Sequence, residues 1–191
     1  MGIRVHRWAV LVVLMLATAA CTAAPPPQTP QTPAAADVAA VDADYARMMT
    51  PHHEQALELS ALVGGRSASP EVADLAFRID REQVEEVGQL QGFLRLRGGP
   101  VDGAATGGTG TMGSMAGMAG PAVLERLRTS SGPAFDRLWL ETMTAHHEGA
   151  LAMAREHLAA TGGTGALVEF SRTLLVSQQA EIDRMTTLLA A

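Results

Sequence analysis

The chain has 191 residues, of which 47% are hydrophobic and 4% aromatic, and its 14 basic and 20 acidic side chains give a net charge of −6. This length suits one domain of about 100–150 residues with accessory segments, so separate cofactor and substrate lobes are not expected. Every basic residue is arginine, which excludes a Schiff-base or phosphate-loop lysine, and the arginines form no cluster of the kind that binds nucleic acid. The single Cys21 excludes an internal disulfide.

Residues 1–21 have the pattern of an export signal that ends in a lipobox. Arg4 and Arg7 precede an apolar run over 8–16 that is too short to span a bilayer, and small residues follow it. The sequence Thr-Ala-Ala-Cys resembles a bacterial lipoprotein box, which implies lipidation of Cys21. The alternative is an ordinary signal peptide cut near the same alanines. We therefore expect an exported protein, anchored by a lipid to the outer face of the cytoplasmic membrane or held elsewhere in the cell envelope.

Two low-complexity segments flank the first of two similar halves. Residues 22–40 are rich in Pro and Ala without apolar periodicity and are expected to form a tether. Residues 98–120 are rich in Gly and are expected to be a loop between the halves. This loop carries Met112, Met115 and Met118 at a spacing of three residues. These methionines are either incidental or an accessory thioether arm for a soft cation such as Cu(I).

The rest of the chain contains an internal repeat. Residues 44–57 match residues 138–151 at an offset of 94, and both segments contain Met-Thr-x-His-His-Glu-x-Ala-Leu. A second block with the pattern Gln-x-x-Glu-[Val/Ile] occurs at 83–87 and again at 178–182, an offset of 95. Duplication of a unit with two segments is the simplest explanation.

All four segments have the periodicity of helices, because their apolar residues recur at steps of three and four. Glycine pairs at 64–65 and 162–163 end the first and third helices and make short connections. Ser69 and Pro70 are a start signal for the second helix. Pro51 lies inside the first helix, and we expect it to kink that helix without breaking it.

These segments assemble into two antiparallel helical hairpins, over residues 41–97 and 121–190. Each hairpin carries an apolar stripe that must be buried against the other hairpin. The sequence therefore predicts an all-α fold, a four-helix bundle over residues 41–190 that is built from two duplicated hairpins.

The two His-His pairs are the residues with the most evident chemistry. On a helix, a Met three residues before the first His faces the same side as both imidazoles. Two such patches exist: Met49, His52 and His53, and Met143, His146 and His147. The alternative is that these histidines are polar residues with ordinary partners. It would have to explain two pairs on duplicated helices with Met at the same spacing, so we interpret the patches as candidate metal sites.

Polar residues also interrupt the apolar stripes of the second and fourth helices. They are Gln83, Glu86, Gln178 and Glu181. Bundle geometry places His146 level with Gln178 and Met143 level with Glu181, and it places His52 and His53 within about one turn of Gln83. Interior amides and carboxylates need partners, and the N–H groups of metal-bound imidazoles are suitable ones, so these four residues are candidate supports for the ligands. Alternatively, the two glutamates lie at the edge of the stripe and reach water.

The paired Met-x-x-His-His-Glu-x-Ala segments, each followed by a helix with Gln-x-x-Glu-[Ile/Val], resemble the bacterial family known as domain of unknown function 305, over about Val41 to Leu189. The resemblance implies a ferritin-like bundle, often exported, in a family with members implicated in periplasmic copper binding and resistance. It also implies a set of candidate ligands: Met49, His52, His53, Met143, His146 and His147, with Met48 as an extra thioether. Thr142 occupies the position of Met48 in the second copy, so the two halves are not equivalent.

Mixed imidazole and thioether ligands favour copper, as Cu(I) where Met dominates and as Cu(II) where His does. Without a free thiolate, a zinc or iron–sulfur site based on cysteine is excluded, and iron and zinc rank behind copper. No catalytic nucleophile or acid–base pair can be identified. We therefore expect a non-enzymatic copper sequestration, transfer or resistance protein. Its partners would be the metal ion, the membrane through the lipid, and a second copy or a metallochaperone or transporter, but not nucleic acid.

Two alternatives stay open. Di-iron oxidases and peroxidases place Glu-x-x-His pairs on a helical bundle, whereas Glu54 and Glu148 directly follow the histidines and so point about 100° away. Bound iron and an oxo-bridge absorption band would identify such an enzyme. The other alternative is a metal-free interaction module of the cell envelope, whose melting temperature would not change on titration with Cu or Ag.

Overall fold

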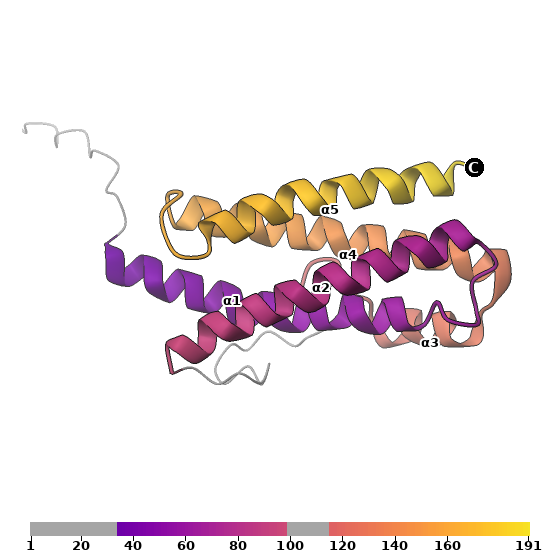
Figure 1. Ribbon diagram of the computed structural model, residues 1–191, viewed down its shortest axis with the longest axis horizontal. Coiled ribbons are helices and arrows are strands. Elements are labelled where there is room, and N and C mark those ends of the chain that lie inside the picture. Colours follow the sequence, from indigo (N-terminus) through magenta and orange to yellow (C-terminus); the bar gives the residue numbers. More distant parts are fainter. Residues whose placement is uncertain (1–33, 99–114) are drawn as a thin grey trace, which may run out of the picture. The chain divides into compact units, whose positions relative to one another are not determined.

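The computed structural model describes residues 34–98 and 115–191, and all regular elements in these two ranges are helices (Figure 1). The proposed signal with Cys21, the tether up to residue 33 and the loop residue Met112 lie outside the described residues. The five helices are α1 (Ala35–Ala61), α2 (Pro70–Leu96), α3 (Pro121–Thr129), α4 (Gly132–Ala160) and α5 (Val168–Leu189). The predicted all-α fold is confirmed, with α1, α2, α4 and α5 as the bundle.

The helices pack in two pairs that meet through α1 and α4. α2 packs along α1, and α5 packs along α4, whereas α2 and α5 touch only slightly. α1 and α4 run antiparallel, because Trp139 on α4 donates to the Leu59 carbonyl at 2.9 Å while the later residue His157 contacts the earlier residue Asp42. The histidine pairs therefore lie on the two helices that join the halves of the bundle.

Local signals in the sequence account for the helix boundaries. The Ser69 hydroxyl accepts from the backbone N–H of Val72 at 3.2 Å, and Pro70 occupies the first turn, as the start signal predicts. Gly163 has a φ of 74°, a conformation that favours glycine, in the connection that follows α4. α1 runs without a break through Pro51.

Two boundaries differ from the sequence prediction. α1 begins at Ala35, so residues 35–40, assigned above to the tether, are helical. Alanines favour helix, and Asp37 in the first turn interacts favourably with the helix dipole. The short helix α3 was not predicted; Pro121 starts it, and the fully buried Leu127 fixes it to the bundle.

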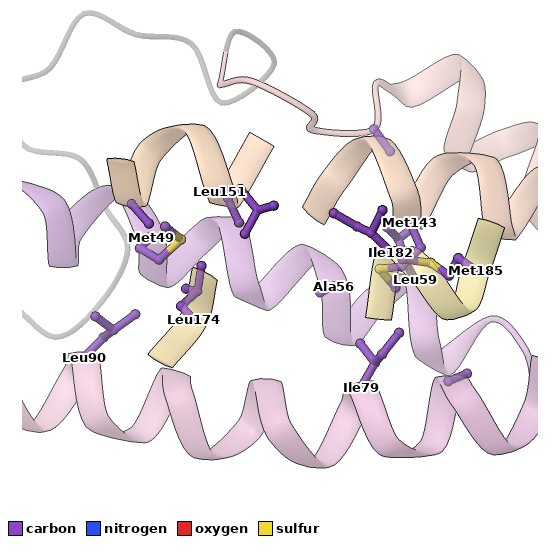
Figure 2. Close-up of a cluster of buried hydrophobic side chains, with 14 of the residues drawn as sticks. Met49, Ala56, Leu59, Ile79, Leu90, Met143, Leu151, Leu174, Ile182 and Met185 are labelled. Carbon is purple, nitrogen blue, oxygen red and sulfur yellow. The ribbon is translucent and has the colours of Figure 1, made fainter. Parts of the chain in front are cut away.

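Most side chains of the core are aliphatic, and the two largest fully buried ones are the aromatic Trp139 and Phe135. Figure 2 shows part of this core, where Met49 lies near Leu174 at one end and Met143 lies near Met185 at the other. Within the described ranges, no helix combines the length and the apolar character that crossing a membrane requires.

Candidate metal centre

α1 and α4 bring all four paired histidines into the interior of the bundle. His52, His53 and His147 have no exposed surface, and His146 is 1% exposed. The ring centroids of His52 and His146 lie 4.0 Å apart, whereas the two rings within each pair lie more than 6 Å apart. The first histidine of each pair therefore meets its counterpart across the α1–α4 contact.

A backbone carbonyl fixes the protonated nitrogen of each of these two central rings. His52 Nε2 lies 3.0 Å from the Ala116 carbonyl oxygen, and His146 Nε2 lies 3.0 Å from the carbonyl oxygen of His52. A carbonyl oxygen can only accept a hydrogen bond, so Nε2 carries the proton in both rings.

Carboxylates hold the second histidine of each pair. His147 Nε2 donates to Glu181 Oε2 at 2.7 Å. His53 Nε2 lies 2.9 Å from Glu86 Oε2, within ion-pair distance but without the alignment of a hydrogen bond. The glutamate side chains are 14% exposed or less, so they contact imidazoles and are not turned out to water.

Each of the four rings leaves Nδ1 without a partner. This atom is buried in His52, His53, His146 and His147 and has no hydrogen-bond partner among the residues that the structure describes. Because an oxygen faces Nε2, the neutral ring keeps its lone pair on Nδ1. A buried polar atom without a partner costs about 1–3 kcal/mol, and in native proteins such an atom usually has an ordered water or ion beside it. Metal-bound histidines have this same arrangement, with the other ring N–H held by a carbonyl or carboxylate.

Burial keeps the central imidazoles neutral. The pKa of His52 is lowered to about 4, mainly by desolvation; the hydrogen bond to Ala116 opposes this shift, and the neighbouring His53 and His147 add to it. Desolvation also places the pKa of His146 well below the usual value, and the neighbouring His52 adds to this effect. Both rings are therefore free to donate a lone pair at neutral pH.

The thioethers divide into two groups. Met49 and Met143 are fully buried in the core, each one turn before its histidine. Because α1 and α4 are antiparallel, Met49 and Met143 lie on opposite sides of the His52–His146 contact along the bundle, and Figure 2 shows them at opposite ends of the core cluster. Met48 does not join this interior group, because 49% of its surface is exposed. Its role as an extra thioether ligand stays a prediction.

The donor set limits the kind of ion that fits. Among residues 34–98 and 115–191, no three His, Cys, Asp or Glu side chains are arranged to hold a metal ion together. An ion at the His52–His146 contact would therefore be bound by few imidazoles, with thioethers as further ligands. Such a set suits a soft monovalent cation and fits poorly with tetrahedral zinc or a di-iron carboxylate centre.

The two amides lie where the interrupted stripes place them. Gln83 is 1% and Gln178 is 2% exposed, and the Oε1 atom of each is buried without a hydrogen-bond partner in the described part of the chain. Their role as supports for the ligands stays a prediction.

Sequence reasoning did not predict the segment that covers His52. Residues 115–119 follow the Gly-rich part of the loop and lie against α1 and α4. The Ala119 N–H donates to Gln55 Oε1 at 2.7 Å, and Gln55 Nε2 donates to the Ala119 carbonyl at 3.0 Å. At the repeat-equivalent position, a Cβ on Gly149 would overlap the Ala116 carbonyl. The difference between Gln55 and Gly149 is the one signal in the sequence, and it cannot be interpreted without the structure.

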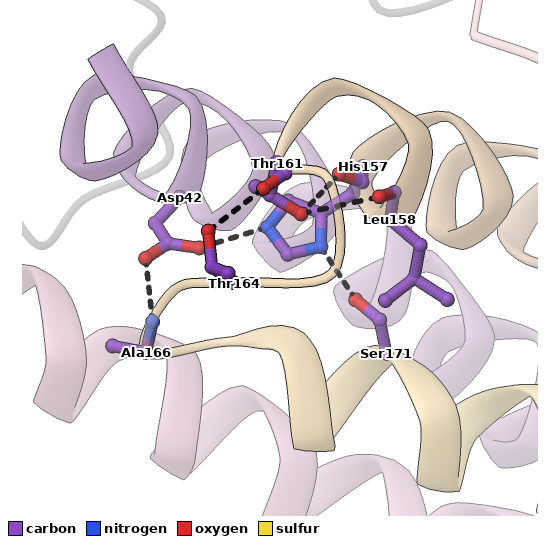
Figure 3. Close-up of polar contacts among 7 residues, drawn as sticks. All are labelled: Asp42, His157, Leu158, Thr161, Thr164, Ala166 and Ser171. Carbon is purple, nitrogen blue, oxygen red and sulfur yellow. Dashed lines mark hydrogen bonds and ion pairs between the residues drawn. The ribbon is translucent and has the colours of Figure 1, made fainter. Parts of the chain in front are cut away.

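Sequence reasoning also missed a second buried region, the polar cluster around His157 (Figure 3). His157 Nε2 donates to Asp42 Oδ1 at 2.8 Å, and His157 Nδ1 lies 2.8 Å from the Ser171 hydroxyl. Asp42 Oδ2 accepts from the backbone N–H of Ala166 at 2.8 Å. Tyr45 stacks on the imidazole with a centroid distance of 4.2 Å. This cluster joins α1, α4 and α5, and both nitrogens of its histidine are occupied.

Comparison with known proteins identifies relatives of the whole bundle. The family model described as Domain of unknown function (DUF305) matches residues 42–189. A DUF305 protein from Streptomyces coelicolor is 34% identical with a TM-score of 0.69, over 78% of this chain and 91% of that chain. A DUF305 fragment from Deinococcus radiodurans is 31% identical with a TM-score of 0.68, over 86% of this chain and 99% of that chain.

The fold is also similar to that of CopM. The Cu(I)-bound form of CopM is 26% identical with a TM-score of 0.61, over 77% of this chain and 94% of that chain. CopM structures in Cu(II)-bound and Ag-bound forms match as well. No curated protein matches the sequence.

Proposed function

The chain belongs to the DUF305 family, and on that premise we propose that it is a non-catalytic protein that binds monovalent copper, with silver as a chemical analogue, between the two His-bearing helices. His52 and His146 would supply Nδ1 lone pairs, and Met49 and Met143 would supply thioethers from either side. His53 and His147 would form the outer part of the same centre, supported by Glu86 and Glu181. Copper is here the cargo of the protein.

One observation carries the proposal: in the described part of the chain, four buried imidazoles have Nδ1 atoms without a partner while an oxygen faces each Nε2. A protein without a ligand at this position would keep four desolvated lone pairs in its core, which is unfavourable. The structural similarity to CopM, which has been solved with Cu(I) and Ag bound, supports the choice of ion.

The cellular role follows from the N-terminal pattern and from a relative. We propose an extracytoplasmic location with lipidation at Cys21, and a role in copper sequestration, transfer or resistance. The Streptomyces relative carries the designation of a secreted protein, which agrees with export. Metabolic labelling with a fatty acid, comparing the wild type with Cys21→Ser, tests the anchor.

Anaerobic titration of the purified protein with Ag(I), and with Cu(I) against a competing chelator, tests the binding centre. We expect the variant with Ala at His52, His53, His146 and His147 to lose the high-affinity ion while it keeps its helical circular dichroism. His157→Gln is the matched control, because it alters a buried histidine whose nitrogens are both occupied. It should lower stability and leave the affinity unchanged. Full affinity in the fourfold variant would refute the assignment.

A further inference from the structure

A cavity of about 360 Å³ opens on the surface beside the buried centre, and methionines from three parts of the chain line it. Met48 comes from α1, Met153 from α4, and Met115 from the segment that covers His52. Unlike the fully buried Met49, Met143 and Met185, Met48 has 49% of its surface exposed. The repeat does not explain the grouping, since Thr142 replaces Met48 in the second half and Leu59 replaces Met153 in the first.

The thioethers are the uncommitted soft donors of this cavity. His157 also lines it, but both nitrogens of that ring are engaged with Asp42 and Ser171 (Figure 3). The carbonyl of Ala116, another lining residue, accepts from His52. Thioether sulfur selects Cu(I) and similar soft ions over Cu(II) and Zn(II), which prefer nitrogen and oxygen.

The charges around the cavity favour a cation. Asp44 and Glu156 line it, and no arginine does. Arg47 pairs with Asp44 at 2.7 Å, whereas Glu156 forms no ion pair in the described part of the chain and supplies the negative charge that is not offset. A carboxylate beside soft donors raises the local concentration of cations.

The cavity and the buried centre share a wall. Ala116 lines the cavity on one side and holds His52 Nε2 on the other. Met48 is followed directly by the buried Met49. An ion in the cavity is therefore separated from the imidazoles by one layer of the chain.

We propose that Met48, Met115 and Met153 form a surface thioether site for Cu(I) or Ag(I), from which the ion passes to the buried histidines. The site itself does not depend on the histidines, whereas its role in loading rests on the proposed function. The transfer exchanges thioether for imidazole ligands on a monovalent ion, without a change in oxidation state.

The test is Ag(I) titration of protein labelled with ¹³C at the methionine methyls, with bound Ag measured in parallel. In the wild type we expect the methyl signals of Met48, Met115 and Met153 to shift together. The variant with Leu at these three positions keeps the side-chain volume; it should bind one equivalent less Ag(I) and load its histidines at least tenfold more slowly. Met118→Leu is the matched control, because Met118 lies in the same segment outside the cavity, and it should change neither quantity.

The outcomes separate this site from the histidine centre. Unchanged stoichiometry in the triple Leu variant, with its metal-free melting temperature preserved, overturns the thioether site. If the triple Leu variant binds one equivalent less Ag(I) but loads its histidines at the wild-type rate, the role of the thioether site in metal entry is overturned. In the fourfold His→Ala variant, Ag(I)-dependent shifts of the three methyls should persist. If wild type and this variant bind the same amount of Ag(I), and the methyl shifts remain, the thioether site stands and the proposed histidine centre fails.

Discussion

The bundle contains two buried histidine regions that differ in how their nitrogens are satisfied. At the His157 cluster, Asp42 and Ser171 occupy both ring nitrogens and join three helices. At the α1–α4 contact, four rings are equally buried, but each leaves Nδ1 unpartnered among the described residues. Burial therefore does not distinguish the structural histidine from the four candidate ligands. The two regions differ in whether the second ring nitrogen has a partner.

The largest expected effect is at the structural cluster. Asp42→Ala should lower the free energy of unfolding by about 3–5 kcal/mol, because it leaves His157 Nε2 and the Ala166 N–H without acceptors in the interior. Urea denaturation measures this loss. Ag(I) affinity of the folded fraction should stay within a factor of two of the wild type. A large loss of affinity would mean that the two regions are not separate.

Acidification should act on the proposed metal centre. The pKa of His52 is lowered from 6.5 to about 4 in the folded protein, so between these values the unfolded chain binds a proton that the folded chain does not. Stability of the metal-free protein is therefore full above pH 6.5 and falls as the pH drops toward 4, by about 3 kcal/mol for this group. His52→Leu should flatten the dependence of the unfolding free energy on pH between 7 and 4. Parallel curves for the two proteins would contradict it.

A variant that displaces residues 115–119 tests how far the histidine centre depends on this covering segment. Gly149→Ala should displace the Ala116 carbonyl from His52 Nε2, since the new methyl group would occupy the position of that carbonyl. Overpacking of this kind costs about 1–3 kcal/mol, and we expect about 2 kcal/mol. Amide exchange of residues 115–119 should rise in this variant. Gly88→Ala, on α2 with open space around the added methyl, is the control that should leave exchange at 115–119 unchanged.

Periodicity and the repeat were sufficient for the bundle, because apolar stripes at helical spacing allow few other arrangements. They also placed the histidine pairs inside. They missed α3, since a nine-residue helix held mainly by Leu127 leaves little periodic signal. The cover over His52 could not be predicted, because its contacts are made by the backbone of small residues, whose identity says nothing about where they pack.

Met48 shows where a resemblance and geometry diverge. It lies about 100° around the helix from Met49, so a buried Met49 directs Met48 outward. The role of Met48 as an extra thioether came from the family pattern and not from helical geometry, and it stays a prediction. The hairpin geometry placed Glu181 level with Met143 and Gln83 near His52 and His53, so it did not predict that each glutamate contacts the second histidine of its half. The contact between His52 and His146 was not predicted, because it depends on how the two halves pack on each other.

The smallest expected effect compares the two halves of the centre directly. Glu181→Gln keeps the shape of the side chain and an oxygen acceptor for His147 Nε2, but it removes the negative charge 2.7 Å from that nitrogen. Loss of a supporting carboxylate lowers metal affinity by about 10–100-fold. Because Gln keeps the oxygen acceptor, we expect a loss of about tenfold. Glu86→Gln should cost less, because Glu86 lies 2.9 Å from His53 Nε2 without hydrogen-bond alignment. Competition titrations with Ag(I) measure both variants. Equal losses would mean that the two halves hold the ion alike, despite Thr142 in place of Met48, whereas no loss in either variant would remove the glutamates from the centre.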